Sequence, residues 1–317
     1  MFFLAGNLKL LLFVLFAGLF YQIYCPDAHA EDKARSEAHS VSPEYRQQLE
    51  RVVVVEEEYF PQELDSYLRF MPSQGADAQS GKVSVTESAS EYSYEIKAFG
   101  KLPVEFAVGT RYIGINNTTL VKLPAHLTEA AIGMETVLPF FNVDKTYFTI
   151  GLAPSFFTDN WNFHASSFRL SQRYFFIYQA DEKLAFVCGV EVIPDFEDPV
   201  SPILGFIYKP NERLAFNITP DRPEISYVLN NKLTVLLEGD RQTREFEVSK
   251  DGIKNTVLKY NEMHLGAGLR YKPNKHIKSS LTAGSVFSRS IKYRDDSLGK
   301  VGIKNGLYVE LRVDMVI

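Results

Sequence analysis

The sequence is poor in cysteine, with two, Cys25 and Cys188, among 317 residues. Cys25 lies in a segment that we expect to be removed, so the mature chain would hold one cysteine and no intramolecular disulfide. An exported protein of this size without disulfides takes its stability from a buried core or from a membrane.

The sequence also lacks long apolar runs, a basic surplus and catalytic motifs. Beyond Phe20 no apolar run approaches the ~18–20 residues that span a bilayer as a helix. The formal net charge of −5 argues against a nucleic acid partner, because phosphate binding needs a basic surface. There is no HExxH, no paired cysteine ligands and no glycine-rich phosphate loop. We therefore expect no metal, no cofactor and no enzymatic activity.

The first thirty residues have the layout of a secretory signal peptide. An apolar run follows Lys9, and the small residues Ala28 and Ala30 precede the charged sequence EDKARSE, which places cleavage after Ala30. The alternative is an N-terminal membrane anchor. Cys25 does not fit a lipoprotein site, because the bulky Tyr24 precedes it.

Aromatic residues are abundant, with 24 Phe and 17 Tyr, and from residue 51 onward the dominant period of the sequence is two. The last segment, NGLYVELRVDMVI, shows it best: Leu307, Val309 and Leu311 are apolar and alternate with Glu310 and Arg312. This pattern predicts a strand with one apolar face and one charged face. It recurs along most of the chain.

The links between these segments alternate in length. Tyr-Lys-Pro-Asn occurs twice, at Tyr208 and Tyr271, and Pro followed by Asn fits a tight type I turn. Longer and more polar links are expected around residues 116–134, 157–165, 194–199, 240–256 and 294–304. Short turns at one end and long loops at the other are typical of an up-and-down barrel.

A soluble sandwich alternates as well, but two features favour lipid as the solvent of the apolar face. That face is rich in Phe, Tyr, Leu and Val, whereas the opposite face mixes charges of both signs with Gly and Ser. Tyr178, Tyr208 and Tyr271 stand on the apolar face before a short turn, as an interfacial aromatic girdle requires. The sequence therefore predicts an all-β fold, a transmembrane antiparallel up-and-down β-barrel of about 14 strands, with 12 as the alternative.

The strand count also sets the expected domain organisation. Both ends of such barrels lie in the periplasm, so the strand number is even and a strand must precede the one near 90–99. We expect that strand in ERVVVVEEEYF (50–60). The predicted organisation is a signal peptide at 1–30, a polar linker at 31–50 that lies in the periplasm or partly plugs the lumen, and a barrel at 51–317.

Several segments carry a family resemblance. KNGLYVEL resembles the C-terminal assembly signal of bacterial outer-membrane barrels, with Gly306, Val309 and Leu311 in place, although Ile317 replaces the usual terminal Phe. LPFFNVDKTYF, RYFFIYQADEKLAFVCGV, LGFIYKPNERLAFNI and HLGAGLRYKPNK are similar to an uncharacterised family of bacterial outer-membrane proteins with a domain of unknown function. The resemblance implies a Gram-negative outer membrane, contact with its lipid and lipopolysaccharide, and insertion by the barrel-assembly machinery. It implies no activity.

The charged face is the candidate functional surface. The side chains expected to face the lumen are Glu95, Lys97, Glu105, Arg111, Arg169, Arg173, Glu191, Arg213, Glu238, Glu262, His264, Arg270, Glu310, Arg312 and Asp314. If these charges pair, they fill the interior; if they line opposite walls, they leave a polarised water path. We interpret His264, beside Glu262 and Arg270, as a satisfied polar residue rather than a catalytic one.

A polar, mixed-charge lumen predicts a channel or transporter for small solutes. The alternatives are a structural or adhesive barrel that acts through its surface loops, and a membrane lipid hydrolase. Trp161, in the expected outer loop DNWNF, is interpreted as an anchor at the membrane interface, with a ligand-binding loop as the alternative.

Overall fold

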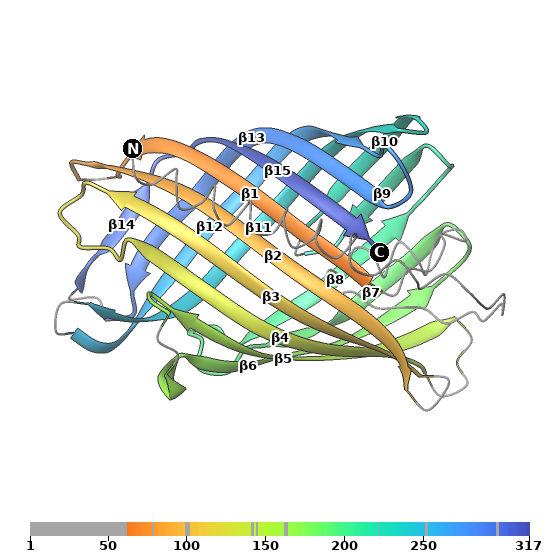
Figure 1. Cartoon of the computed structure of the whole chain (residues 1–317), viewed down its shortest axis with the longest axis horizontal. Coiled ribbons are helices and arrows are strands. Elements are labelled where there is room, and N and C mark those ends of the chain that lie inside the picture. The colour runs from red at the N-terminus through yellow and green to blue at the C-terminus, as the bar shows by residue number, and fades with distance from the viewer. Residues whose placement is uncertain are drawn as a thin grey trace, which may run out of the picture. The chain divides into compact units, whose positions relative to one another are not determined.

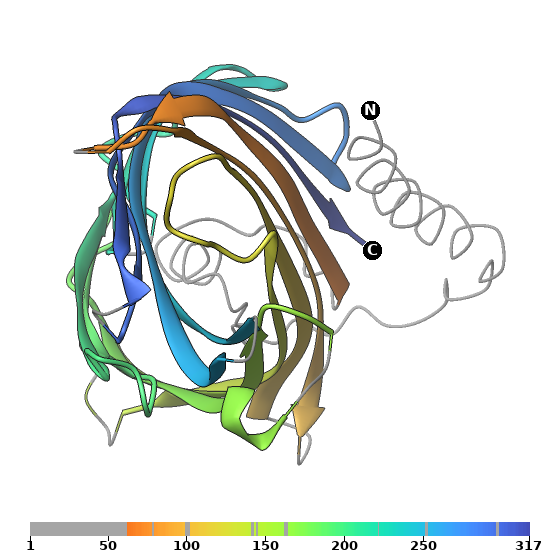
Figure 2. The same cartoon turned by 90° about the vertical axis from the view of Figure 1, so that its left-hand side faces the viewer.

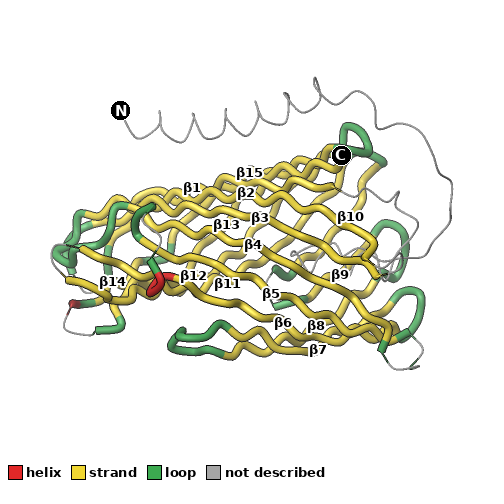
Figure 3. Tube along the Cα trace, turned by 60° about the horizontal axis from the view of Figure 1, so that its bottom comes forward, coloured by secondary structure: helices red, strands yellow, loops and turns green. Residues whose placement is uncertain are grey.

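The computed structural model describes residues 62–77, 79–98, 102–140, 143, 145–161, 164–220, 222–250, 253–295 and 298–317. The predicted signal peptide and linker lie outside these residues. Strands dominate the described part (Figure 3). They are β1 (Gln62–Gly75), β2 (Lys82–Ala98), β3 (Leu102–Asn117), β4 (His126–Pro139), β5 (Thr146–Thr158), β6 (Phe168–Gln179), β7 (Leu184–Val192), β8 (Val200–Tyr208), β9 (Leu214–Ile218), β10 (Glu224–Asn230), β11 (Leu233–Lys250), β12 (Ile253–Tyr271), β13 (Ile277–Tyr293), β14 (Lys300–Ile303) and β15 (Gly306–Val316).

One short 3-10 helix, η1 (Ala165–Ser167), precedes β6. Among the described residues, no helix has the length and apolar character needed to cross a membrane.

The strands close into one barrel (Figures 1 and 2). Each strand from β1 to β13 pairs with the next, and β15 closes the ring between β13 and β1. β14 pairs with the last residues of β13 and is followed by β15 after two residues, so the two act as one wall strand. The wall therefore has 14 strands, which confirms the predicted class and number.

The first wall strand differs in position from the one expected. β1 (Gln62–Gly75) precedes β2, whereas the segment 50–60 lies outside the described residues. The even-number rule requires a strand before the one near 90–99 but does not locate it, and the four consecutive valines at 52–55 do not alternate. In β1 the inward positions carry Asp65 and Arg69. Charged residues have a low strand propensity, so propensity alone does not identify β1 as a strand.

A second difference concerns residues 240–256, which were expected to form a long loop. The described part of this range belongs to β11 and β12, which pair continuously from Leu233 and Tyr271 up to Val248 and Thr256. The range is polar because its inward side chains, such as Asp240 and Gln242, join charged groups in the interior. The polar residues in this range face the lumen from two strands, and they do not indicate a loop.

The outer surface of the barrel is apolar. Large exposed side chains include Phe70, Phe106, Val108, Ile132, Phe176, Phe186, Leu204, Leu237, Leu265, Leu281 and Val309. Tyr178, Tyr208 and Tyr271, the proposed girdle, are also exposed and lie at the strand ends near short turns. A wall that exposes this much apolar surface fits lipid and not water. The fold is therefore a transmembrane-type antiparallel barrel, as predicted.

The two ends of the barrel differ. We call the end that holds Gln62, Ile317 and the short turns the turn end, and the opposite one the loop end. At the loop end the β3–β4 loop, yellow in Figure 2, curves inside the ring of strands. Its Leu123 is buried in the interior, and Tyr293 donates a hydrogen bond to the carbonyl oxygen of Lys122.

The wall is also uneven in height, because β9 and β10 are only 5 and 7 residues long. Between these short strands and the loop end, Glu247 of β11 pairs with Thr158 of β5 in a parallel bridge. The amide of Asp159 also donates a hydrogen bond to the Glu247 carbonyl oxygen. In the described part of the chain, the loop end is thus walled by nine strands, β1–β5 and β11–β14, of which β14 has only 4 residues. This is close to the size of about eight strands at which side chains fill the interior of a barrel.

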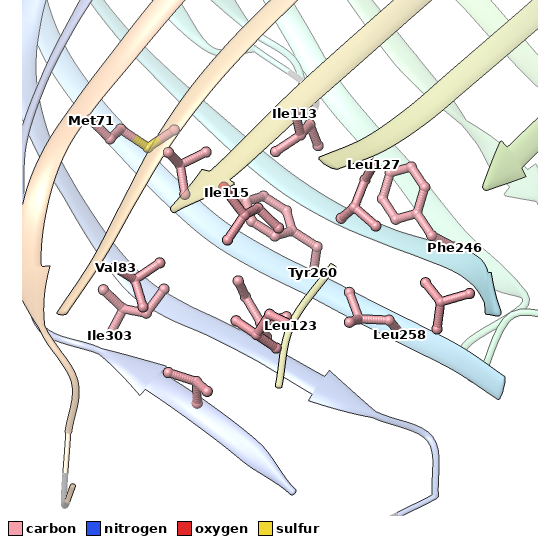
Figure 4. Close-up of a cluster of buried hydrophobic side chains, with 14 of the residues drawn as sticks. Met71, Val83, Ile113, Ile115, Leu123, Leu127, Phe246, Leu258, Tyr260 and Ile303 are labelled. Atoms are coloured by element: carbon pink, nitrogen blue, oxygen red, sulfur yellow. The ribbon is translucent and has the colours of Figure 1, made fainter. Parts of the chain in front are cut away.

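Apolar side chains do fill it. Figure 4 shows Met71, Val83, Ile113, Ile115, Leu123, Leu127, Phe246, Leu258, Tyr260 and Ile303 converging in the interior, and all are buried. We call this group the loop-end core. The interior of the loop end is therefore packed like the core of a soluble protein, and a network of charged side chains lies next to it in the lumen.

Candidate functional site: the charged lumen and its side opening

Arg69 of β1 is the centre of the ionic network in the lumen. Its side chain is 2% exposed. Nε donates to Glu310 Oε2 at 2.7 Å, Nη2 to Asp240 Oδ2 at 2.7 Å and Nη1 to Glu87 Oε2 at 3.2 Å. Three strands that are far apart in the sequence, β2, β11 and β15, thus place carboxylates around one cation. Buried charges of this kind are stable only when paired and hydrogen-bonded.

Neighbouring residues extend this network across the barrel. Tyr67 donates to Glu87 at 2.6 Å, and Arg111 Nη1 donates to the same carboxylate at 3.0 Å. Arg222, from the short β9–β10 link, donates to both Glu238 and Glu310 at 2.9 Å. Because Arg222 belongs to the low part of the wall, this link is held inward by its ion pairs.

His264 lies on the same face and is buried. Its Nε2 is 3.2 Å from Glu262 Oε1, and its ring meets the ring of Tyr308 edge to face at 4.9 Å. Tyr260 donates a short hydrogen bond to the other oxygen of Glu262. These contacts place His264 within the structural network, away from the surface. No group of three or more His, Cys, Asp or Glu among the described residues could hold a metal ion.

Beside this network lies a cavity of about 350 Å³. Arginines from β1, β3, β6 and β11 and carboxylates from β2, β3, β4 and β7 line it, together with small residues such as Gly109, Gly133 and Gly151. Arg173 and Glu191 form one ion pair in its wall, with Nε and Oε1 2.9 Å apart. The cavity can hold a small polar molecule and offers it charges of both signs.

The cavity reaches a break in the barrel wall. The pairing of β8 with β9 ends at Phe206 and Ile218, and that of β10 with β11 ends at Glu224 and Glu238. Above this level β8 and β11 have no strand between them in the described part of the chain. Arg241 and Thr243, on the outward parity of β11, line the cavity with the inward residues, so it extends to this side opening.

The β7–β8 loop, residues 193–199, crosses the side opening, and we call it the strap. Its Phe196 is buried in the loop-end core, with its ring 5.6 Å from that of Phe157. Lys259 Nζ contacts Glu197 Oε2 at 2.9 Å and Asp198 Oδ2 at 2.8 Å. The amide of Glu197 donates to Glu245 at 2.8 Å. One ring and several ion pairs thus hold the strap across the opening.

Two lysines, Lys259 and Lys292, keep Glu197 of the strap ionised. Hydrogen bonds from Lys259 and Lys292 lower the pKa of Glu197 to about 2. About half of the Glu197 side chain is exposed to solvent, so each ion pair is screened and individually weak. The strap is held by several weak contacts and one apolar anchor, an arrangement suited to reversible release.

Family comparison identifies the chain. The model of the domain of unknown function DUF6268 matches residues 104–304. The chain belongs to the DUF6268 family. This confirms the resemblance to an uncharacterised family, and the match runs from β3 to the β14–β15 junction. None of the curated proteins matches this DUF6268 chain.

Solved structures that resemble the chain include three outer-membrane barrels. An outer membrane channel from Pseudomonas putida F1 is 8% identical, with 90% of this chain and 100% of that chain covered and a TM-score of 0.47. A Pseudomonas aeruginosa FadL homologue is 10% identical (80% and 89% covered, TM-score 0.42), and LpxR from Salmonella typhimurium is 8% identical (80% and 100%, TM-score 0.38). At these values no function is carried over to the DUF6268 chain.

Most of the sequence-predicted charged residues of this DUF6268 chain are buried or half-buried on inward-facing strand positions. These are Glu95, Glu105, Arg111, Arg169, Arg173, Glu191, Glu238, Glu262, His264, Arg270, Glu310, Arg312 and Asp314. Lys97 and Arg213 differ, because both are exposed. Lys97 is the second-last residue of β2, and Arg213 lies in the turn before β9, so both side chains are at the turn end of the barrel.

The remaining predicted positions lie on β15 and at the loop end. Gly306 begins β15, Val309 and Leu311 are exposed on its outer face, and the amide of Ile317 donates to the Gln62 carbonyl. Trp161 is exposed in the β5–β6 loop. Whether these residues act in assembly or anchoring stays a prediction.

Sequence reasoning missed three central residues of the network. Arg69 and Asp65 belong to β1, which was placed too early in the chain, and Asp240 fell in the range interpreted as a loop. The alternation of polar and apolar residues along β1 is the signal that could have identified Asp65 and Arg69. Asp65, Tyr67, Arg69 and Met71 alternate with Leu64, Leu68 and Phe70, which is the pattern of the other wall strands.

Proposed function

We propose that this DUF6268 protein is a Gram-negative outer-membrane transporter for small polar solutes, with a path through its mixed-charge lumen. The turn end would face the periplasm, and the apolar wall would contact membrane lipid and lipopolysaccharide. Insertion would use the barrel-assembly machinery. The observation that carries the proposal is the cavity of about 350 Å³ lined by charges of both signs inside a wall with an apolar exterior.

The geometry also favours one route. The loop-end core closes the direct path along the barrel axis, whereas the cavity extends to the side opening beneath the strap. We therefore place the outer exit of the path at this opening, with the strap closed in the present conformation. Solutes that carry both charges fit best, because arginines and carboxylates both line the cavity.

The test is a change that releases the strap. In Lys259→Glu the contacts with Glu197 and Asp198 become repulsive, so the strap should leave the opening more often. We expect a larger mean conductance in planar bilayers, and faster swelling of loaded liposomes, than for the unmodified protein. Lys232→Glu is the matched control, since Lys232 is exposed in the β10–β11 turn at the other end.

A conductance that is equally low in the unmodified protein, Lys259→Glu and Lys232→Glu would contradict the proposed route. It would favour the second candidate, a structural or adhesive barrel. The filled loop end is the observation behind that candidate, because a barrel closed by packed side chains can act only through its outer loops.

The strap should not respond to ordinary changes in pH. The pKa of Glu197 is lowered in the folded protein, so its contribution is fully present above the ordinary carboxyl pKa of 4.5 and is lost as the pH falls toward 2. We expect constant conductance from pH 8 to pH 5 and a rise only below that range. A rise between pH 7 and pH 5 would show that another group holds the strap.

A further inference from the structure

The strap contacts the outer face of the barrel wall as well as the loop-end core. Side chains alternate across β12, so Lys259 has the same parity as Met263 and Leu265, which are exposed on the outer face. Glu245 of β11 is directly opposite Lys259, and Lys292 of β13 is directly opposite it on the other side. The strap therefore covers outward-facing charged residues on three neighbouring strands.

Six charged side chains take part in this contact, and we call them the strap cluster. They are Lys259, Lys292, Arg294, Glu197, Asp198 and Glu245. Arg294 donates to Glu245 and, at 2.6 Å, to the carbonyl oxygen of Asp195 in the strap. With the strap in place, three cations meet three carboxylates, so the charges of the cluster balance.

One oxygen of Glu197 bridges two lysines. Its Oε2 is 2.9 Å from Lys259 Nζ and 3.0 Å from Lys292 Nζ. The two lysines are directly opposite each other on one face of the sheet, where like charges repel, so they favour an anion between them. In the closed strap this anion is a carboxylate. A phosphate offers the same lysines more charge and more oxygens.

The strap supplies the outer two of the three carboxylates. The side chains of Glu197 and Asp198 are 46% and 75% exposed, whereas that of Lys259 beneath them is 9% exposed. When the strap moves away, the three cations of the cluster keep Glu245 as their carboxylate, which leaves an excess of two positive charges. Release of the strap thus turns a balanced cluster into an anion-binding surface.

The strap cluster lies at the edge of the apolar band on the wall. Along the outer face of β12, the apolar Leu265 and Met263 are followed by Asn261 and Lys259 in the direction of the loop end. Lys259 is four residues from Met263, roughly 13 Å along a strand that is tilted to the membrane normal. The cluster therefore lies at the level of lipid headgroups, whose phosphates are held there by their own acyl chains.

We infer that the phosphate of a lipid headgroup competes with the strap for Lys259, Lys292 and Arg294. When it binds, it replaces the strap carboxylates on these cations, and the strap leaves the side opening. The lipid at the rim of the barrel thus sets how often the opening is free. This consequence for the path rests on the proposed function, whereas the competition itself is independent of transport.

Neutralising the strap tests the competition directly. In Glu197→Gln/Asp198→Asn the strap no longer carries the competing charges. We expect this variant to bind phosphatidic acid about fivefold more tightly than the unmodified protein, because the lipid no longer displaces weak surface ion pairs. The measurement is a titration of the folded full-length mature protein in detergent, followed by native mass spectrometry. The matched control is Glu182→Gln/Glu212→Gln, in exposed turns at the other end, which should bind like the unmodified protein.

Removing the lysines should have the opposite effect. We expect Lys259→Gln/Lys292→Gln to bind phosphatidic acid about twentyfold more weakly, because each lysine beside an anionic headgroup contributes a factor of about five. Lys183→Gln/Lys232→Gln removes two exposed lysines from the turn end and should leave binding unchanged. All variants are first confirmed as folded by their heat-modifiable mobility on gels. If the lysine variant does not fold, Glu197→Gln/Asp198→Asn still decides the question, because it keeps every cation of the cluster.

Hydrogen–deuterium exchange reports the position of the strap. The amide of Ile193 donates to the Pro199 carbonyl oxygen and the amide of Glu197 donates to Glu245, both at 2.8 Å, so these amides are protected in the closed strap. We expect the peptide of residues 193–199 to exchange faster when phosphatidic acid is added to phosphatidylcholine vesicles that hold the protein. Inorganic phosphate at the same concentration should have little effect, because no acyl chains hold it at the cluster.

The inference is overturned if Glu197→Gln/Asp198→Asn binds phosphatidic acid no more tightly than the unmodified protein, which would mean that the lipid and the strap use separate sites. It is also overturned if phosphatidic acid leaves the exchange of the strap unchanged. Equal acceleration by inorganic phosphate would identify a free anion as the ligand and reject the lipid. None of these measurements depends on conductance, so the inference can fail while the proposed function holds, and the reverse.

Discussion

Replacing Arg69 with methionine should lower the free energy of unfolding by about 3–5 kcal/mol, the usual cost of breaking a buried ion pair from one side. The carboxylates of Glu87, Asp240 and Glu310 converge on this guanidinium, and all three pair with it within 3.2 Å. Methionine keeps a similar length and apolar stem but leaves these negative charges close together in the interior. The measurement is the urea midpoint of unfolding in detergent micelles or lipid vesicles.

Two variants make this result specific. Arg213→Met removes an exposed arginine from a turn and should change stability by less than about 0.5 kcal/mol. Adding Glu87→Gln and Glu310→Gln to Arg69→Met should recover part of the loss, because neutral groups need no buried counter-charge. If Arg69→Met is as stable as Arg213→Met, the lumen is wetter than the structure indicates and the network contributes little.

Phe246→Ala should cost about 3–5 kcal/mol if the loop end is packed as a protein core. Phe246 is fully buried, and its ring meets that of Phe157 edge to face at 5.8 Å. The cost combines the lost transfer of the ring from water with the cavity that remains, because the surrounding strands relax only in part. Urea unfolding measures it, and the intact β5–β11 bridge should keep the fold.

The control for this prediction is Leu120→Ala, in the same end of the barrel. Leu120 is 85% exposed in the β3–β4 loop, so its truncation should leave the unfolding midpoint almost unchanged. A water-filled loop end would give a different result: Phe246→Ala would then be nearly as mild as Leu120→Ala. That outcome would remove the argument that the axial path is closed and the side opening is used.

The sequence determined which side of each strand meets the membrane. Side chains alternate across a strand, so lipid outside and a polar interior produce a period of two that can be read without coordinates. Tyr208 and Tyr271 before the Pro-Asn turns, and the final alternation through Leu311, follow from the same rule. The strand number followed from the even-number rule, even though the first strand was placed too early.

The interior contacts were beyond such reasoning. Arg69 and Glu310 are 241 residues apart in sequence, and their pairing depends on the closure of β15 onto β1. Parity placed Glu310 in the lumen but could not say which cation it would meet. The inward face of β2 illustrates the limit, because it carries Val83 and Val85 at one end and Glu95 at the other, all on one parity.

The amino-acid sequence by itself thus determined the barrel, its apolar exterior and its charged lumen, because these follow from local alternation and from the solvent on each face. Only the tertiary structure decided that the loop end narrows and closes. Unequal strand lengths bring β11 to β5, and this contact turns the inward residues of the tall strands into a packed core. It also leaves a side opening above β9 and β10, because those strands end too early to join the closure.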